Sequence, residues 1–337
     1  MTGDPLLSVE DLVVQFPAQS RGSFLKRQTV KAVNGVSIEL RAGEALGIVG
    51  ESGSGKSTLG RAILGLTDIK SGHVTLDGVP VSQRRREHIA KLHRETAMVF
   101  QDPFGSLNPK ITAGETIAEV LRVHRKVPPG EIHRRVGELL GLVGLRPELA
   151  MRYAHEMSGG QCQRVGVARA LAVEPKLIIA DECVAALDVS IQGQIINLFM
   201  ELRARMNLSL IFIAHDLAIV RRLCDRVAVM YLGRIVEEGP TEAVFRAPRH
   251  PYTAALIRAI PEIDPDITLP AELLVGEPPS PLNLPLGCSF HPRCSFAQDR
   301  CRSGPWPPVR QDQGRSWACV LESDLSEQKI QPERVLS

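Results

Sequence analysis

The sequence predicts an α/β fold with a mainly parallel β-sheet, and three observations carry that prediction. Apolar segments of strand length recur along the chain and alternate with segments of helical periodicity. A glycine-rich turn follows one apolar strand and opens a helix at Lys56. Another apolar strand ends in two acids, Asp181 and Glu182. Strands that alternate with helices pair in parallel and are covered by helices on both faces.

The elements follow from the pattern in chain order. Residues 7–16 and 33–40 alternate between apolar and polar positions, as half-buried strands do. The other expected strands are 45–49, 72–81 (with a turn), 97–101, 177–180, 210–214 and 227–231, with helices at 56–66 and 84–94. Residues 114–154 have helical periodicity interrupted at Val127–Gly130 and at Pro147, which predicts a helical insertion. From Pro248 the chain is rich in proline, so we expect a loop-rich extension there.

Composition excludes several classes of protein. The 337 residues are 44% apolar and 23% charged, which is typical of a globular protein with a large core. A net charge of +2 gives no strong general attraction to nucleic acid. No apolar run approaches the roughly 18 residues that span a bilayer, and Met1–Ser8 lacks a basic signal-peptide start. We expect a cytosolic chain, or one that reaches a membrane through a partner.

A phosphate-binding loop is predicted after the strand at 45–49. The sequence GESGSGKS matches G-x-x-x-x-G-K-[ST] between a strand and a helix, which is the context that the motif requires. Its glycines let backbone N–H groups converge on phosphate, its lysine reaches the outer phosphates, and its serine hydroxyl ligates Mg²⁺. The predicted nucleotide contacts are Gly50, Glu51, Ser52, Gly53, Ser54, Gly55, Lys56, Ser57 and Thr58.

Four polar residues follow other buried strands and are predicted to meet this loop at one edge of the sheet. Asp181 can hold Mg²⁺ through water, and Glu182 can orient or deprotonate the attacking water. Gln101 and His215 each follow an apolar strand and can contact the γ-phosphate, the metal or the water. The predicted catalytic residues are Glu182, His215 and Gln101, and the predicted Mg²⁺ ligands are Ser57, Gln101 and Asp181.

Residues 157–161 read MSGGQ and open a helix, which resembles the signature of ABC ATPases. The chain is therefore similar to an ABC transporter ATP-binding subunit over residues 6–245. That resemblance implies a P-loop NTPase with a RecA-like core, an antiparallel β subdomain and a helical subdomain at about 105–165. It also implies a head-to-tail dimer, in which each ATP lies between one subunit's phosphate loop and the other's signature. The residues this adds are Ser158, Gly159, Gly160, Gln161 and Asp188, with Phe16 stacking on adenine.

Three further segments resemble the oligopeptide/dipeptide and nickel importer ATPases: Gln101–Pro109, Pro248–Thr253 and Gly287–Cys294. This resemblance assigns residues 246–337 to the C-terminal extension of that family. It implies ATP hydrolysis that drives import of a peptide or similar small solute. The implied partners are a second, related ATPase subunit, two membrane permeases and, indirectly, a solute-binding protein. The implied location is the cytoplasmic face of the inner membrane.

The sequence departs from the family pattern at three positions. Cys183 stands where proline is usual after Asp-Glu, and Ala185 stands where serine is common. Phe16 replaces the usual tyrosine and keeps the aromatic face that stacks on adenine. None of the three removes a phosphate, metal or water contact, so we expect an active ATPase.

Four of the seven cysteines lie close together near the C-terminus, at Cys288, Cys294, Cys301 and Cys319. In a cytosolic protein clustered thiols indicate metal ligands before disulfides. Their spacing, C-x5-C-x6-C-x17-C, differs from the close pairs of zinc ribbons and is compatible with a [4Fe–4S] cluster. The resemblance also implies an iron–sulfur cluster. Zinc and unligated structural thiols stay open as alternatives.

Two other functions are weighed against transport. A soluble ABC ATPase acting on nucleic acid or ribosomes is suggested by the basic segments 21–31 and 84–94, which are more often solvated surface. The near-neutral total charge speaks against it, and no nucleic acid partner is expected. The third function is a sensor whose cysteine centre regulates the ATPase.

Overall fold

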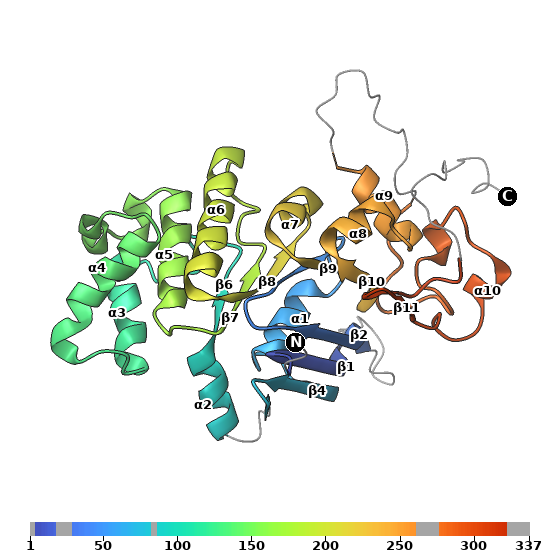
Figure 1. Ribbon diagram of the computed structural model, residues 1–337, viewed down its shortest axis with the longest axis horizontal. Coiled ribbons are helices and arrows are strands. Elements are labelled where there is room, and N and C mark those ends of the chain that lie inside the picture. The colour runs from blue at the N-terminus through green and yellow to red at the C-terminus, as the bar shows by residue number, and fades with distance from the viewer. Residues whose placement is uncertain (1–3, 18–28, 82–85, 261–275, 322–337) are drawn as a thin grey trace, which may run out of the picture.

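The computed structural model describes residues 4–17, 29–81, 86–260 and 276–321. Most of the basic segment at 21–31 and the first two residues of the one at 84–94 lie outside these residues. Residues 261–275 and 322–337 of the predicted extension lie outside them as well. In the described part of the chain, two β-sheets are stacked with helices between and around them (Figure 1).

The larger sheet carries the predicted parallel core. Its strand order is β11-β12-β10-β9-β3-β8-β7-β6, and the run from β9 to β6 is parallel. The strands are β3 Ala45–Val49, β6 Thr96–Val99, β7 Leu177–Asp181, β8 Ser209–Ala214, β9 Arg226–Tyr231, β10 Arg234–Pro240, β11 Arg310–Asp312 and β12 Arg315–Trp317.

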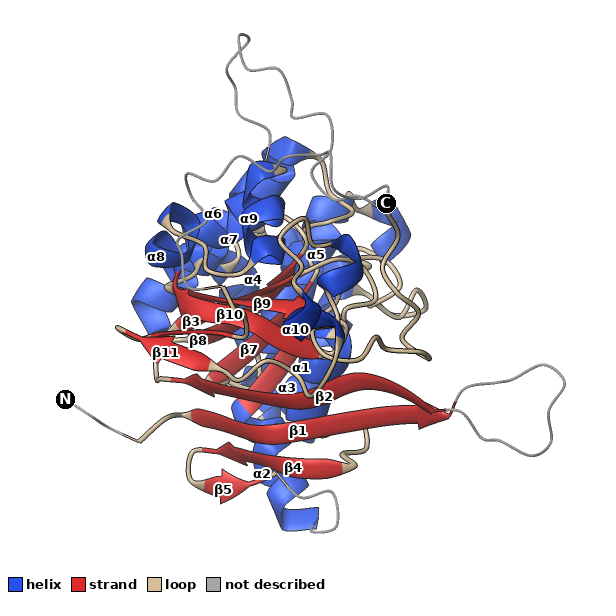
Figure 2. Cartoon of the chain, turned by 90° about the vertical axis from the view of Figure 1, so that its right-hand side faces the viewer, coloured by secondary structure: helices blue, strands red, loops and turns tan. Residues whose placement is uncertain are grey.

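A smaller antiparallel sheet lies beneath the first, as Figure 2 shows. It has the order β2-β1-β4-β5 and corresponds to the antiparallel β subdomain that the resemblance implied. Its strands are β1 Leu7–Pro17, β2 Thr29–Leu40, β4 Ser71–Leu76 and β5 Val79–Pro80. The second strand begins earlier than the alternating pattern indicated, at Thr29 rather than at Val33.

Helices fill the space between the sheets and cover the opposite face. The α-helices are α1 Lys56–Ile63, α2 Arg86–Glu95, α3 Ala113–Val123, α4 Ile132–Leu142, α5 Gly159–Leu171, α6 Val189–Met206, α7 Leu217–Leu223, α8 Thr241–Arg246, α9 Pro251–Arg258 and α10 Asp299–Arg302. Short 3₁₀ turns lie at η1 Pro129–Glu131, η2 Pro147–Met151, η3 Ala154–Glu156 and η4 His291–Arg293. No helix within the described ranges has the length and apolarity of a membrane span.

The central strands are buried on both faces because their side chains alternate between two apolar clusters. On β8, Ile211 and Ile213 face the cluster shared with α1 and the small sheet. Leu210 and Phe212 face the cluster on the other side, which includes residues of α5, α6 and α7. This double burial explains why these strands appear in the sequence as continuous apolar runs.

The helical insertion extends from one end of the large sheet, at the left of Figure 1. It is made of α3, α4 and α5, and the prolines that interrupt its pattern start η1 and η2. Thr112 caps α3 by accepting a hydrogen bond from the backbone N–H of Glu115. The insertion thus begins and ends where capping residues and prolines indicate.

The described part of the extension has more regular structure than its sequence suggested, and it joins the large sheet. Strand β12 pairs with β10, so the hairpin β11–β12 continues the large sheet. Tyr252 and Phe290 of the extension belong to the main apolar cluster. Strands of three residues are too short to produce a recognisable alternation, which is why the sequence indicated only loops.

Candidate functional site

The register of the parallel strands brings the predicted phosphate, metal and water residues to one edge of the sheet. Val49, the last residue of β3, pairs with Ala214, so the glycine-rich loop and His215 leave neighbouring strands side by side. Asp181 at the end of β7 pairs with Ile213 of the same β8. Val99 at the end of β6 pairs with Ala180, which places Gln101 just beyond the same edge. The chain therefore has a polar site at the carboxyl ends of its strands, where open α/β sheets bind ligands.

The glycine-rich loop wraps the N-terminus of α1 because a side chain would not fit at its last glycine. Gly55 has a φ of +104°, and a Cβ there would lie 2.0 Å from the carbonyl oxygen of Ala32 on β2. The tight turn leaves the first N–H groups of α1 turned toward the loop, which favours an anion.

The loop lysine, Lys56, is held inside the loop by backbone carbonyl groups. Lys56 Nζ donates to the carbonyl oxygens of Gly50, at 2.8 Å, and Glu51, at 3.0 Å. It also lies 3.7 Å from a carboxylate oxygen of Glu182. Burial lowers the pKa of Lys56, and the nearby Glu182 and Asp181 charges oppose that shift. An anion bound in the loop would stabilise the charged form of this amine.

Two of the three predicted metal ligands, Ser57 and Asp181, are in contact. Ser57 Oγ donates a hydrogen bond of 2.7 Å to Asp181 Oδ1. Burial raises the pKa of Asp181, and the Ser57 hydroxyl and Arg61 work against that rise. A divalent cation at this point would be bound by oxygen atoms, which Mg²⁺ prefers, and would favour the carboxylate over the acid.

Glu182 has an uncommon backbone conformation, with a φ of +46°. Its N–H donates to the carbonyl oxygen of Ile213, at 2.9 Å, which fixes the residue against the end of β8. Strained backbone of this kind persists where surrounding structure imposes it, and it is common at functional sites. The next residue, Cys183, is completely buried, and burial raises the pKa of its thiol to about 12. Cys183 therefore fills space as a neutral side chain.

The remaining residues predicted near the nucleotide are on the surface. Gln101 and His215 are exposed at the strand ends. Phe16 is 42% exposed and pairs with Val30 of β2, two residues before the Ala32 that contacts the loop. An exposed aromatic ring beside the phosphate loop is compatible with stacking on a base.

The predicted signature residues form the start of α5, where Ser158 is exposed, Gly159 and Gln161 are partly exposed and Gly160 is buried. Ser158 and Gln161 make a capping box: Ser158 Oγ accepts from the Gln161 N–H, and Gln161 Oε1 accepts from the Ser158 N–H. Gly160 is needed for close packing, because a Cβ there would lie 2.7 Å from a methyl group of Ile191 on α6. Gly159 lies between Ser158 and Gly160 as the first residue of α5, and Asp188 directly precedes α6. The exposed Ser158 and Asp188 are accessible to another molecule.

Two residues of the extension contact the phosphate loop, and sequence reasoning missed both. The Tyr252 hydroxyl accepts a hydrogen bond of 2.8 Å from the backbone N–H of Glu51. The Arg293 guanidinium donates to both carboxylate oxygens of Glu51, at 2.6 and 3.0 Å. Both residues stand in segments that resemble importer ATPases, but no local pattern could reveal a contact between Arg293 and a loop 242 residues away.

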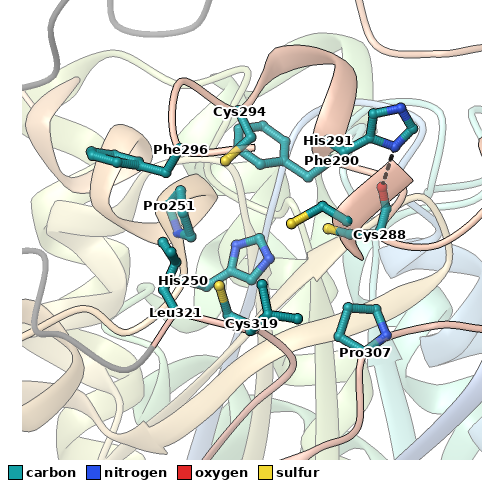
Figure 3. A pocket seen from close by; sticks show the side chains of 12 residues that line it. His250, Pro251, Cys288, Phe290, His291, Cys294, Phe296, Pro307, Cys319 and Leu321 are labelled. Atoms are coloured by element: carbon teal, nitrogen blue, oxygen red, sulfur yellow. Dashed lines mark hydrogen bonds between the residues drawn. The ribbon is translucent and has the colours of Figure 1, made fainter. Parts of the chain in front are cut away.

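The four clustered cysteines line one small cavity in the extension (Figure 3). The cavity is shared with His250, Phe290 and His291. In Figure 3 the sulfur atoms of Cys288, Cys294 and Cys319 point toward this space. Burial raises the pKa of Cys288 to about 11 and that of Cys294 to about 12, and neighbouring thiols add to both shifts. The four thiols predicted as ligands thus line one pocket, and burial raises the pKa of three of them, Cys288, Cys294 and Cys319.

Within the described ranges, no three His, Cys, Asp or Glu side chains are arranged to hold a single metal ion. All seven cysteines are free thiols, and three of them lie outside the cavity. Cys162, Cys183 and Cys224 are buried in the main apolar cluster, as packing residues. Only the four cysteines of the extension therefore share a common space.

Comparison with known protein families gives two matches along the chain. Residues 33–185 match the family described as "ABC transporter". Residues 236–301 match the family described as "Oligopeptide/dipeptide transporter, C-terminal region". The second match covers the junction between the sheet and the extension, including Tyr252 and Arg293.

Individual relatives agree with both matches. The chain is 50% identical to the oligopeptide transport ATP-binding protein OppF of Escherichia coli, over 88% of this chain and 90% of that protein. It is 45% identical to the di/tripeptide transport ATP-binding protein DppF of Pseudomonas aeruginosa, over 94% of this chain and 97% of that protein.

A solved structure agrees at the level of the fold. It is a dimeric post-hydrolysis state of an ATP-binding cassette bound to ADP and Pi, with a TM-score of 0.62 and 26% identity. The alignment covers 70% of this chain and 98% of that one. The phosphate loop, the acids at the strand ends, the signature segment at the start of α5 and these likenesses agree, and the chain belongs to the ATP-binding subunits of the oligopeptide/dipeptide ABC importer family.

Proposed function

We propose that this chain binds and hydrolyses Mg-ATP to power import of a di- or oligopeptide, or a similar small solute, through a membrane ABC transporter. The observation that carries this proposal is the convergence of Lys56, the Ser57–Asp181 pair and Glu182 at one edge of the sheet. The similarity to oligopeptide and di/tripeptide transport proteins supports the choice of substrate class.

Each group at the edge has a role in phosphoryl transfer. The loop N–H groups and Lys56 bind the phosphates, and Phe16 stacks on the base. Mg²⁺, held by Ser57, Gln101 and, through water, Asp181, would supply positive charge to the phosphate oxygens. Glu182 orients or deprotonates the attacking water, while His215 and Gln101 contact the water and the terminal phosphate. The constrained backbone at Glu182 favours a fixed carboxylate position for that task.

Completion of the site requires a second ATPase subunit. The exposed Ser158 and Asp188 are accessible to a nucleotide bound to another chain, and each motif occurs once in this sequence. We propose that the partner is a related subunit rather than an identical one. Two permeases and, indirectly, a solute-binding protein complete the transporter, so the chain works at the cytoplasmic face of the inner membrane. The match of the extension to peptide transporters favours this function over action on nucleic acid.

We also propose that Cys288, Cys294, Cys301 and Cys319 hold a [4Fe–4S] cluster. Support comes from the shared cavity and from the softness of thiolate ligands, which iron–sulfur clusters use. Because a cluster is larger than one ion, its ligands stand further apart than zinc ligands do. The absence of a single-ion arrangement in the described ranges therefore weighs against zinc, the alternative, more than against a cluster.

The central test is Glu182→Gln in the assembled transporter. We expect Mg-ATP hydrolysis to fall by roughly 10² or more, because the water loses its activating group, while ATP binding is kept. The matched control is Glu201→Gln on the exposed surface of α6, which should leave turnover unchanged. Equal turnover of Glu182→Gln and wild type would refute the assigned role of Glu182.

A further inference from the structure

Residue 51, the second residue of the phosphate loop, is held by the extension as well as by its own loop. Its backbone N–H donates to the Tyr252 hydroxyl, and its carboxylate accepts both bonds from Arg293. Its carbonyl oxygen accepts from Lys56 Nζ. The first two contacts fix Glu51 from outside the loop, and the third transmits its position to the phosphate-binding lysine.

The Arg293–Glu51 pair is built for rigidity. The Arg293 side chain is only 5% exposed and that of Glu51 is 27% exposed, so solvent screens the pair less than a surface ion pair. Two parallel bonds fix the relative orientation of the two groups, which a single contact would not do. Burial tends to lower the pKa of Arg293, but the hydrogen bonds that it donates to Glu51, together with the nearby Tyr231 hydroxyl, outweigh burial and raise the pKa overall.

Arg293 lies on the short turn η4 between two cysteines of the cavity. Cys288 precedes this turn and Cys294 follows it directly. Phe290, next to the turn, packs edge-on against Tyr231 with ring centroids 5.3 Å apart, and it is equally close to Tyr252. The segment from Cys288 to Cys294 therefore contributes two thiols to the cavity and, through Arg293, contacts the phosphate loop.

From this geometry we propose that Arg293 is a positioning residue for ATP: it sets the phosphate loop through Glu51 and links that loop to the cysteine cavity. This inference rests on the proposed ATPase function. Arg293 does not touch the reacting atoms and acts by holding Glu51, and so the carbonyl to which Lys56 is bonded. Its removal weakens the arrangement of the loop before the nucleotide binds.

The test is the ATP dependence of hydrolysis by the assembled transporter. We expect Arg293→Ala to raise the KM for ATP about tenfold, as loss of a charge-assisted pair does. We expect kcat to stay within about threefold, since the water and metal groups are intact. Glu51→Gln should raise KM similarly, and Arg293→Lys should recover part of the loss because one bond can re-form. The matched control is Arg300→Ala, an exposed arginine of the same extension bonded to Gln298 and Val320, which should keep the wild-type KM.

The double variant Arg293→Ala/Glu51→Gln separates positioning from general loosening of the fold. If Arg293 acts through Glu51, the double variant has the KM of Arg293→Ala alone. Effects that multiply, or a KM within twofold of wild type in both single variants, overturn the proposal. If Arg293→Ala does not fold, Glu51→Gln alone decides by the same KM criterion. A wild-type transporter without Glu182-dependent hydrolysis would instead overturn the proposed function.

Discussion

Ser57 and Asp181 are 124 residues apart in the chain, yet the Ser57 hydroxyl donates a 2.7 Å hydrogen bond to the Asp181 carboxylate. The bond joins the start of α1 to the end of β7 and holds two oxygen groups where a cation would be bound. The fold therefore holds these two oxygen groups side by side, which reduces the ordering that metal binding must impose.

We predict that Ser57→Ala raises the Mg²⁺ concentration for half-maximal hydrolysis about tenfold, because the metal loses one oxygen ligand. A magnesium titration of the ATPase rate at saturating ATP measures this. Ser57→Thr, which keeps the hydroxyl and still satisfies the motif, is the control and should behave as wild type. An unchanged magnesium requirement in Ser57→Ala would contradict Ser57 as a ligand.

The buried His250 makes the fold sensitive to acid. Burial lowers the pKa of His250 to about 3. Its Nδ1 accepts a hydrogen bond from the Tyr252 N–H, and protonation of Nδ1 would remove that bond. Below pH 6.5 the imidazole of His250 binds a proton in the unfolded chain but stays neutral in the folded chain until about pH 3. The free energy of unfolding therefore falls between about pH 6.5 and pH 3, by up to about 1.4 kcal/mol per pH unit.

Urea unfolding of the chain at several pH values measures that slope. His250→Asn keeps an acceptor at the helix cap and removes the titrating ring, so its acid slope should be shallower by about one proton. His73→Asn, on an exposed residue of β4, should keep the wild-type slope. An identical slope in His250→Asn would show that His250 does not titrate in this way.

The cysteine cavity predicts a coloured protein. Chain purified without oxygen should contain iron and show broad visible absorbance, and Cys294→Ser should lose most of both. Cys162→Ser, which changes a buried thiol outside the cavity, should retain them. Zinc in place of iron, or neither metal in the wild type, would contradict the cluster.

Glu237 should be a strong contributor to stability. Its side chain has no exposed surface and accepts bonds from the backbone N–H groups of Arg249 and His250 and from the Arg315 guanidinium. Glu237→Ala leaves these donors buried without an acceptor, so we expect a loss of about 3–5 kcal/mol in denaturant unfolding. Glu242→Ala, at an exposed ion pair on α8, should leave the denaturation midpoint close to that of the wild type. A loss below about 1 kcal/mol in the free energy of unfolding of Glu237→Ala would contradict a strong contribution of Glu237 to stability.

The sequence predicted the strands and the phosphate loop because these depend on local patterns. Asp181 could be placed near Ser57 from the rule that parallel strands end at one edge, without knowledge of any contact. The bond from Arg293 to Glu51 could not be predicted, because it depends on how an irregular segment folds back over the sheet. The pairing of β12 with β10 was missed for the same reason, since its register involves only two residue pairs.

That pairing has a consequence for how the chain is made. Strand β10 can pair with β12 only after Ser316 and Trp317 have been synthesised, some 80 residues later. Until then the ribosome-bound chain has an open strand edge, which promotes association with other chains, and Glu237 lacks its Arg315 partner. An mRNA that ends before the codons for β12 would therefore yield an aggregating protein rather than a smaller working ATPase.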